Sequence, residues 1–345
     1  MGRGGPPRRA CRLLLLVTAA SAAAAQAAPP DSPYQLVGTI PLRGGEPSGQ
    51  LAVHAATHRL FVPHSVRLTV VDLDKGRQLG EVPETRGVGG VALAPALGRG
   101  FTSNGAANTI TIFNLRTLKV SSDHPETGAH PAAIVYDPVP GRVFTLNADS
   151  NNATAITATD GSTAGTIPLG GRPGMAVTDG AGRVYVDLQD RHEIAVLDTR
   201  VLRVVRRWPV ASCPGSVSLA IDVAHGRLFL GCRNGTMAAI DTDSGRVVVT
   251  LPIGHSVDVV RYDAGSNLVF AASSDGTLAV VYQETPDAYR ILDAIGTRPG
   301  VRGMEVEPST HRLYLAVREP TTTDASHRQR EAGATGSLVI LIYAR

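Results

Sequence analysis

Aromatic and sulfur-containing residues are scarce in this sequence. Of its 345 residues, 4% are aromatic, one is tryptophan and three are cysteine. Binding of single-stranded nucleic acid uses aromatic side chains as stacking platforms beside a basic groove, so nucleic-acid binding is a weak alternative here. The chain also contains no His-Glu-x-x-His, Cys-x-x-Cys-His or Gly-x-Ser-x-Gly sequence. These absences exclude three common motifs of zinc peptidases, haem attachment and hydrolases, so no motif assigns a reaction or a catalytic residue.

The first 27 residues have the pattern of a signal peptide. Four arginines precede an apolar stretch from Leu13 to about Ala25, and small residues follow at Ala25-Gln26-Ala27. The apolar stretch is shorter than the roughly 20 residues that a membrane span needs. We therefore predict cleavage after residue 27, export to the periplasm or beyond, and a mature chain of residues 28–345 without a membrane anchor.

Removal of this segment changes the charge of the protein. The whole chain carries +3 at pH 7, and residues 1–27 contribute four arginines and no acid, so the mature chain carries −1. A chain of this charge has no overall attraction for nucleic acid or anionic membranes. Any basic binding site must therefore be local.

Two cysteines remain after cleavage, Cys213 and Cys232. An even number of cysteines in an oxidising compartment indicates a disulfide. The two residues flank predicted strands whose ends meet at the same rim, so we predict that they are bonded to each other.

A short motif, arginine followed two residues later by an aromatic residue, recurs along the chain. The aromatic residues are spaced by 40, 43, 41, 44, 41 and 44 positions, at Phe61, Phe101, Phe144, Tyr185, Phe229, Phe270 and Tyr314. A period of 40 to 45 residues, with short β-branched runs between glycine, asparagine and aspartate turns, is typical of a β-propeller. We predict an all-β protein with seven four-stranded blades, from repeats at about 43–85, 86–127, 128–170, 171–212, 213–254, 255–298 and 299–345.

The last repeat lacks its fourth strand. Residues 337–343 match a third strand, and nothing comparable follows them, whereas residues 34–42 read like a fourth strand before the first repeat. We therefore predict that residues 34–42 complete the last blade and close the ring, which removes an exposed sheet edge.

The repeats resemble the YVTN type of β-propeller repeat, and the second half resembles its exported YncE-like group. The resemblance rests on Gly171-Arg172-Pro173-Gly174, Arg183-Val184-Tyr185-Val186, Ile194 to Thr199, Leu251-Pro252-Ile253-Gly254, Ser273 to Leu278 and Glu284-Thr285-Pro286-Asp287. It covers nearly the whole mature chain. It implies an exported propeller and leaves the function open, because the family has no common reaction.

Residues that recur at one position in most blades are interpreted as scaffold. The arginine of the motif is present in six of seven repeats, and we expect it to pair at the lower rim. His58, His225 and His311 share the turn before that arginine, and we do not expect them to form a metal site because the blades hold them apart.

Positions that differ between blades but share one face are better candidates for binding. The residues before each first strand are mostly cationic: Glu46, Arg86, His130, Arg172, Cys213, His255 and Arg298. Guanidinium groups suit carboxylate and phosphate oxygens, so we predict that all of these except Cys213 bind an anionic small molecule or an acidic segment of a partner protein. Alternatively, they pair with nearby acids, namely Asp149, Asp187, Asp190, Asp258 and Asp275.

An enzyme remains the alternative to a binding protein. Glu46, Asn104, Asn147 and Asp187 could hold calcium in the channel of a lactonase or other hydrolase. Otherwise we predict no metal and no cofactor, and we expect a monomer. The polar insertion from Glu319 to Gly336 is expected to be disordered or, alternatively, to act as a lid.

Overall fold

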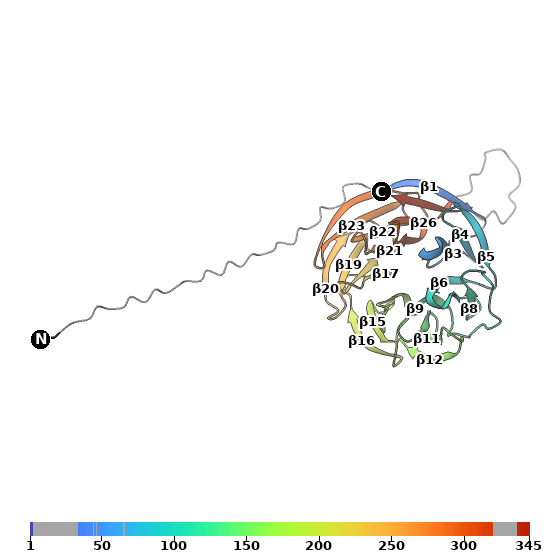
Figure 1. The fold of residues 1–345 in the computed structure, drawn as a ribbon, viewed down its shortest axis with the longest axis horizontal. Coiled ribbons are helices and arrows are strands. Elements are labelled where there is room, and N and C mark those ends of the chain that lie inside the picture. Colours follow the sequence, from blue (N-terminus) through green and yellow to red (C-terminus); the bar gives the residue numbers. More distant parts are fainter. Residues whose placement is uncertain (3–33, 44, 46, 65, 320–336) are drawn as a thin grey trace. The chain divides into compact units, whose positions relative to one another are not determined.

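The described residues from Tyr34 to Arg345 form one compact unit, a ring of seven antiparallel sheets around a central channel (Figure 1). The structure is a computed structural model that describes residues 1–2, 34–43, 45, 47–64, 66–319 and 337–345. The seven-bladed β-propeller prediction is confirmed. The predicted signal peptide, apart from its first two residues, and the insertion after Glu319 lie outside the described residues.

The innermost strand of each blade lines the channel. These strands are β2 (Ala52–His54), β6 (Val88–Ala94), β9 (Pro131–Asp137), β13 (Pro173–Thr178), β17 (Ser216–Asp222), β21 (Val257–Asp263) and β25 (Val301–Glu307). The second strands are β3 (Arg59–His64), β7 (Arg99–Asn104), β10 (Arg142–Asn147), β14 (Arg183–Leu188), β18 (Arg227–Cys232), β22 (Leu268–Ser273) and β26 (Arg312–Glu319). Short 3-10 helices, η1 (Ala55–Thr57) and η2 (Pro95–Leu97), follow the innermost strands of blades 1 and 2.

The third and outermost strands complete the blades. The third strands are β4 (Arg67–Asp72), β8 (Thr109–Asn114), β11 (Asn152–Thr157), β15 (Glu193–Asp198), β19 (Thr236–Asp241), β23 (Thr277–Thr285) and β27 (Ser337–Ala344). The outermost strands are β5 (Arg77–Val82), β12 (Thr163–Pro168), β16 (Arg203–Pro209), β20 (Val247–Pro252), β24 (Ala288–Gly296) and β1 (Gln35–Leu42). We call the face with the loops that enter the innermost strands the upper face, and the face with the turns that leave them the lower face.

Blade 2 differs from the others because its outermost position holds no regular strand. The segment after β8 pairs with it only at two isolated bridges, Phe113 with Val120 and Thr109 with Glu126. Pro125 lies in this segment, and proline cannot donate a hydrogen bond to a neighbouring strand. Its carbonyl nevertheless accepts a bond from Ile110 N at 3.0 Å, so the edge of β8 is covered.

The ring closes where the first described strand, β1, meets the last, β27. β1 pairs antiparallel with β27 and forms the outer edge of blade 7, with Ile40 opposite Ile340. The Tyr34 hydroxyl donates to the carbonyl of His311 at 2.9 Å, and its ring lies edge-on to Phe270 at 5.0 Å between centroids. The predicted closure by residues 34–42 is confirmed.

Hydrophobic contacts hold each blade to the next. There are seven buried clusters, and each joins one pair of neighbouring blades. All seven aromatic residues of the repeat are buried in them, with no more than 2% of their surface exposed. Complete burial of such a side chain stabilises the fold by roughly 1.5 to 3 kcal/mol, which explains why each repeat carries one.

The arginine of the motif joins its own blade to the third strand or following turn of the next blade at the lower face. Four of these arginines donate to a carbonyl of the neighbour, in the pairs Arg59–Leu115 (2.8 Å), Arg99–Ala158 (3.2 Å), Arg142–Thr199 (3.0 Å) and Arg227–Pro286 (2.9 Å). A fifth, Arg183, lies 3.8 Å from the Asp243 carboxylate of the next blade. The interpretation of this arginine as scaffold is confirmed.

The three lower-face histidines have separate carboxylate partners. His225 Nδ1 lies 2.7 Å from Asp222, His311 Nδ1 lies 2.8 Å from Asp263, and His58 Nδ1 lies 3.3 Å from Asp74. The three carboxylates lie in different parts of the lower rim. Each histidine therefore makes a separate contact, and the three do not converge on one site.

Candidate functional site

The loops that carry the predicted binding residues are held together in pairs at the upper face. In each of six blades, an amide at the end of the second strand or directly after it donates to a carbonyl in the loop before the innermost strand. The pairs are Gly105–Gly87, Ala148–His130, Gln189–Arg172, Arg233–Gly215, Ser274–Ser256 and Arg318–Gly300, at 2.8 to 3.2 Å. The two sets of loops therefore share one face.

These bonds also correct the alignment of the candidate residues. His130 and Arg172 occupy the bonded position, whereas Arg86 and His255 lie one residue before it and Arg298 two residues before it. The bonded residue is usually in the left-handed backbone region, which favours glycine: Gly87 (φ 70°), Gly215 (φ 64°) and Gly300 (φ 89°) adopt it. Glu46 lies outside the described residues.

Two of the candidate cations share one acid. Arg172 Nη1 lies 2.8 Å from Asp149 Oδ1, and His130 Nδ1 lies 3.3 Å from Asp149 Oδ2. The hydrogen bond from Arg172 is the main cause that lowers the pKa of the Asp149 carboxyl. Asp149 therefore remains ionised and links the loops of blades 3 and 4.

The other four acids considered as partners have different roles. Asp190 accepts from the backbone amide of Arg172 at 2.7 Å, and Asp275 accepts from the backbone amide of Thr277 at 3.0 Å. Asp258 lies 3.5 Å from Arg302, and Asp187 accepts from the Ser216 hydroxyl. Within the part of the chain that the structure describes, none of these four pairs with a candidate cationic side chain.

The remaining candidate cations are exposed. Among the described residues, the side chains of Arg86 and His255 have no hydrogen-bond or ion-pair partner. Arg298 is exposed as well and has an interaction of its own. Three arginine and two histidine side chains thus lie on upper-face loops, and among the described residues Asp149 is shared by Arg172 and His130.

Asp187 is a buried carboxyl group beneath this face. It lies on β14 in blade 4, is 0% exposed, and contacts Ser216 at the start of β17 in blade 5. Its second oxygen has no hydrogen-bond partner among the described residues, and a Cβ added to Gly174 would lie 2.8 Å from it. Burial raises the pKa of Asp187 to about 6.

The asparagines of the calcium alternative use their side chains within their own blades. Asn104 Oδ1 accepts from Thr102 at 2.8 Å, and its amide donates to Thr111 at 2.8 Å. Asn147 has the same arrangement with Thr145 at 3.0 Å and Thr154 at 2.9 Å. No group of three or more histidine, cysteine, aspartate or glutamate side chains suited to a metal ion is present among the described residues.

The predicted disulfide is present on the same face. The sulfur atoms of Cys213 and Cys232 lie 1.98 Å apart, and both residues are buried. Cys213 is in the loop that enters blade 5, and Cys232 ends β18. The bond therefore fastens an upper-face loop to the sheet behind it.

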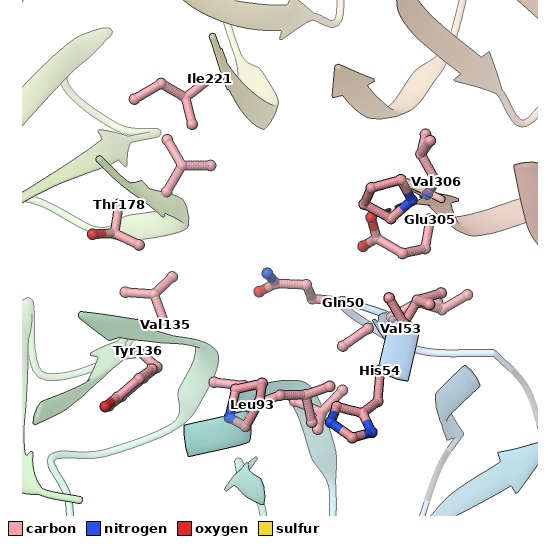
Figure 2. Close-up of a pocket in the computed structure, with 18 of the residues that line it drawn as sticks. Gln50, Val53, His54, Leu93, Val135, Tyr136, Thr178, Ile221, Glu305 and Val306 are labelled. Carbon is pink, nitrogen blue, oxygen red and sulfur yellow. Dashed lines mark hydrogen bonds between the residues drawn. The ribbon is translucent and has the colours of Figure 1, made fainter. Parts of the chain in front are cut away.

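A cavity that the sequence did not reveal lies in the central channel (Figure 2). It has a volume of about 570 Å³ and is lined by innermost strands of six blades and by η1 and Pro95. Because these are the ends of the innermost strands, the cavity lies toward the lower face. A signal that could have revealed it is the residue paired with the blade aromatic, because five of the seven such residues line the cavity: Ala52, Ala92, Val135, Val177 and Glu305.

No family model and no curated protein matches this chain. Among solved structures, the chain is similar to hydrazine synthase of Kuenenia stuttgartiensis, with a TM-score of 0.71 and 13% sequence identity. The match covers 80% of this chain and 94% of the other. At this identity the likeness shows the propeller fold alone. A search for helices long and apolar enough to cross a membrane finds none in the described residues.

Proposed function

We propose that this protein is an exported, non-catalytic binding module that recognises an anionic small molecule, or an acidic segment of a partner protein, through its upper face. The observation that carries the proposal is the set of three exposed arginines and two exposed histidines on loops entering blades 2, 3, 4, 6 and 7, with Asp149 shared by one arginine and one histidine. Arginine presents a planar fork of donors that matches carboxylate and phosphate oxygens.

The positive charge on these loops is local. The mature chain carries −1, so an anion meets no overall attraction and is drawn only to this face. The proposal of export rests on the N-terminal pattern of residues 1–27, on the resemblance to the exported YncE-like group of YVTN propellers, and on the compatible disulfide.

The test is binding of defined anions to residues 28–345. Thermal shift and calorimetry with succinate, inorganic phosphate, glucose 6-phosphate and a hexaglutamate peptide cover both proposed ligand classes. A ligand at 100 times its dissociation constant adds about 2.7 kcal/mol of stability, which gives a measurable shift. We expect at least one of these anions to bind.

A matched pair of variants shows whether the upper face is responsible. Arg86, Arg172 and Arg298 are replaced together by glutamine, and the control replaces Arg77, Arg203 and Arg246, which are exposed at the starts of outermost strands, near the lower face. Both triples remove the same charge, so only a local site distinguishes them. Loss of anion binding in the first triple alone supports the proposal, and equal affinity in both triples contradicts it.

Two further additions address the alternatives. Calcium with gluconolactone tests the hydrolase, and turnover of the lactone would replace the binding module with an enzyme. An oligothymidylate tests nucleic-acid binding, for which affinity falls steeply with salt.

A further inference from the structure

The chain contains two Asn-Gly sequences, Asn104-Gly105 in blade 2 and Asn234-Gly235 in blade 5. Both lie at the upper face between a second and a third strand, since Asn104 ends β7 and Asn234 follows β18. Asparagine loses its side-chain amide most readily before glycine, because glycine has no Cβ to hinder attack by its backbone nitrogen. The same reactive sequence therefore occurs twice on one face, and its surroundings decide where it reacts.

Deamidation needs a carboxamide that is free to move, and water. The backbone nitrogen of the glycine forms a bond with the asparagine Cγ while the Cγ–Nδ2 bond breaks, and Nδ2 leaves as ammonia with the proton of the glycine amide. Water then opens the cyclic succinimide at either carbonyl, which gives aspartate or isoaspartate. The reaction exchanges no electrons, and water is its only co-reactant. A carboxamide that is bonded inside the protein cannot turn toward the attacking nitrogen.

Asn104 is bonded in this way. Only 1% of its surface is exposed. Its Oδ1 accepts from the Thr102 hydroxyl at 2.8 Å, and its Nδ2 donates to Thr111 Oγ1 at 2.8 Å and to Thr109 Oγ1 at 3.3 Å. Rotation toward Gly105 N would leave these groups unpaired inside the blade, which is costly. The carboxamide of Asn104 is therefore protected.

Asn234 is exposed in the turn between β18 and β19. Among the described residues, its Nδ2 has one partner, the Ser212 carbonyl at 3.4 Å, which is long for a hydrogen bond. Its Oδ1 accepts from the Thr236 hydroxyl at 2.8 Å, and this bond is exposed as well. Water can replace both contacts, so the carboxamide can rotate toward Gly235 N without leaving a polar group unpaired.

The surroundings of the two glycines are alike. Gly105 N and Gly235 N each donate to a backbone carbonyl, at 2.8 and 3.1 Å. A histidine lies beside each glycine: a Cβ added to Gly105 would lie 3.4 Å from His130 Nε2, and one added to Gly235 would lie 3.4 Å from His255 Nδ1. The difference between the two sites therefore lies in the carboxamides.

We propose that Asn234 is a modification site of this protein, where spontaneous deamidation gives aspartate and isoaspartate while Asn104 is preserved. The new carboxylate is ionised at neutral pH, so each event makes the net charge more negative by one unit and adds an acid to the upper face beside Arg233 in the chain. In the isoaspartate form the main chain runs through Cβ, which lengthens the turn after Cys232. The proposal does not depend on anion binding, because it concerns a chemical change in the chain itself.

Timed incubation of residues 28–345 at pH 8.5 tests the proposal. Mass spectrometry of the tryptic peptides 100–116 and 234–246 follows both sites in one sample, and fragmentation assigns the change to one asparagine. We expect Asn234 to convert at least about tenfold faster than Asn104, the difference that one retained hydrogen bond would give. Equal rates in the folded protein, or no conversion at Asn234, would overturn the proposal.

Incubation in concentrated guanidinium chloride is the control for the neighbouring sequence. Unfolding frees both carboxamides, so Asn104 and Asn234 should then convert at similar rates. A ratio of rates that is the same in the folded and the unfolded chain would mean that the fold does not protect Asn104, and would contradict the proposal.

A matched pair of variants identifies the source of the acidic form. Asn234→Gln removes the site, because attack on a glutamine side chain forms a larger ring and is slower. The control is Asn151→Gln, at an exposed upper-face asparagine that is not followed by glycine. In ion-exchange chromatography the acidic form should accumulate in the unmodified chain and in the control, and be lost in Asn234→Gln. Equal accumulation in all three proteins contradicts the proposal.

Discussion

The lower and upper faces of the ring use charged residues in different ways. At the lower face the same arginine recurs from blade to blade and donates to the next blade's carbonyl group, as Arg142 does to Thr199 and Arg227 to Pro286. At the upper face the residue type changes from blade to blade, and only His130 and Arg172 share a carboxylate in the described part of the chain. Recurrent, paired charges hold the blades together, and the variable, exposed charges are the ones that we propose to bind a ligand.

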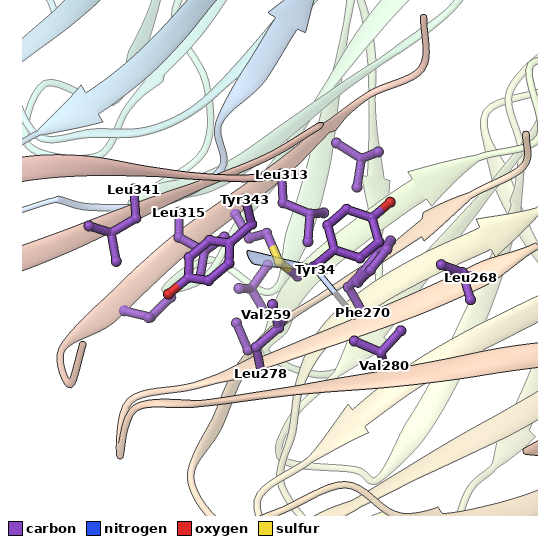
Figure 3. Close-up of a cluster of buried hydrophobic side chains, with 14 of the residues drawn as sticks. Tyr34, Val259, Leu268, Phe270, Leu278, Val280, Leu313, Leu315, Leu341 and Tyr343 are labelled. Atoms are coloured by element: carbon purple, nitrogen blue, oxygen red, sulfur yellow. The ribbon is translucent and has the colours of Figure 1, made fainter. Parts of the chain in front are cut away.

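The comparison depends on a closed ring, and deletion of residues 28–42 would open it. Tyr34, Ile40 and Leu42 are buried, and Tyr34 lies among side chains of blades 6 and 7 (Figure 3). Loss of three such side chains costs roughly 6 kcal/mol, which corresponds to a decrease in melting temperature of more than about 10 °C. Differential scanning calorimetry of residues 28–345 and 43–345 measures it, and an unchanged melt would contradict closure by β1.

A single arginine from each face tests the difference directly. Arg227 is 11% exposed and donates to Pro286 O, Asp241 and Asp287, so Arg227→Ala should reduce the free energy of unfolding by about 3 kcal/mol. Arg172 is 47% exposed, and Arg172→Ala should cost at most about 0.5 kcal/mol. Urea denaturation of both variants gives the two values, and similar values would remove the distinction between the faces.

Asp187 differs from the exposed charged residues of the upper face because its carboxyl group is buried. Burial raises its pKa to about 6, so the folded protein keeps this proton to a higher pH than the unfolded chain. As the pH rises from about 4 to about 6, the free energy of unfolding should therefore decrease, by an amount on the order of 3 kcal/mol. Asp187→Asn should abolish this fall and stabilise the protein at pH 7.5.

The matched control for that variant is Asp149→Asn. The Asp149 carboxyl has a lowered pKa because of Arg172, so its contribution has the opposite sign and is lost as the pH falls. Urea denaturation at pH 4.5 and pH 7.5 separates the two. An Asp187→Asn protein with the same pH dependence as the unmodified chain would show that Asp187 does not carry the effect.

The sequence predicted the parts of this fold that repeat. The buried aromatic residues, the arginine of the motif, the pairing of Cys213 with Cys232 and the closure by residues 34–42 each follow from a pattern visible in the chain. The aromatic residue and the arginine recur because most blades need the same contacts with their neighbours. The disulfide follows from the even number of cysteines, and the closure follows from the missing fourth strand of the last repeat. Comparison between repeats is therefore enough to find them.

The alignment of the upper-face loops and the cavity in the channel could not be predicted by comparing the repeats. The loop alignment was displaced by one or two residues because the bonded position is defined by backbone geometry, as at Gly87 and Gly215, and not by side-chain type. The channel cavity was missed because irregularities in the innermost strands, such as that between Val88 and Gly90, change which side chains face the axis. The partner of Asp187 belongs to another blade, and no local pattern marks it.

Because β1 pairs with β27, blade 7 cannot be completed until both of these strands have been synthesised. The partner of residues 35–42 is residues 338–344, so β1 remains unpaired during synthesis until β27 has been made. A chain that ends before residue 337 exposes the apolar edge of β1 and an open seventh blade, two surfaces that proteases and chaperones recognise. A prematurely terminated product is thereby distinguished from the finished protein by its structure alone.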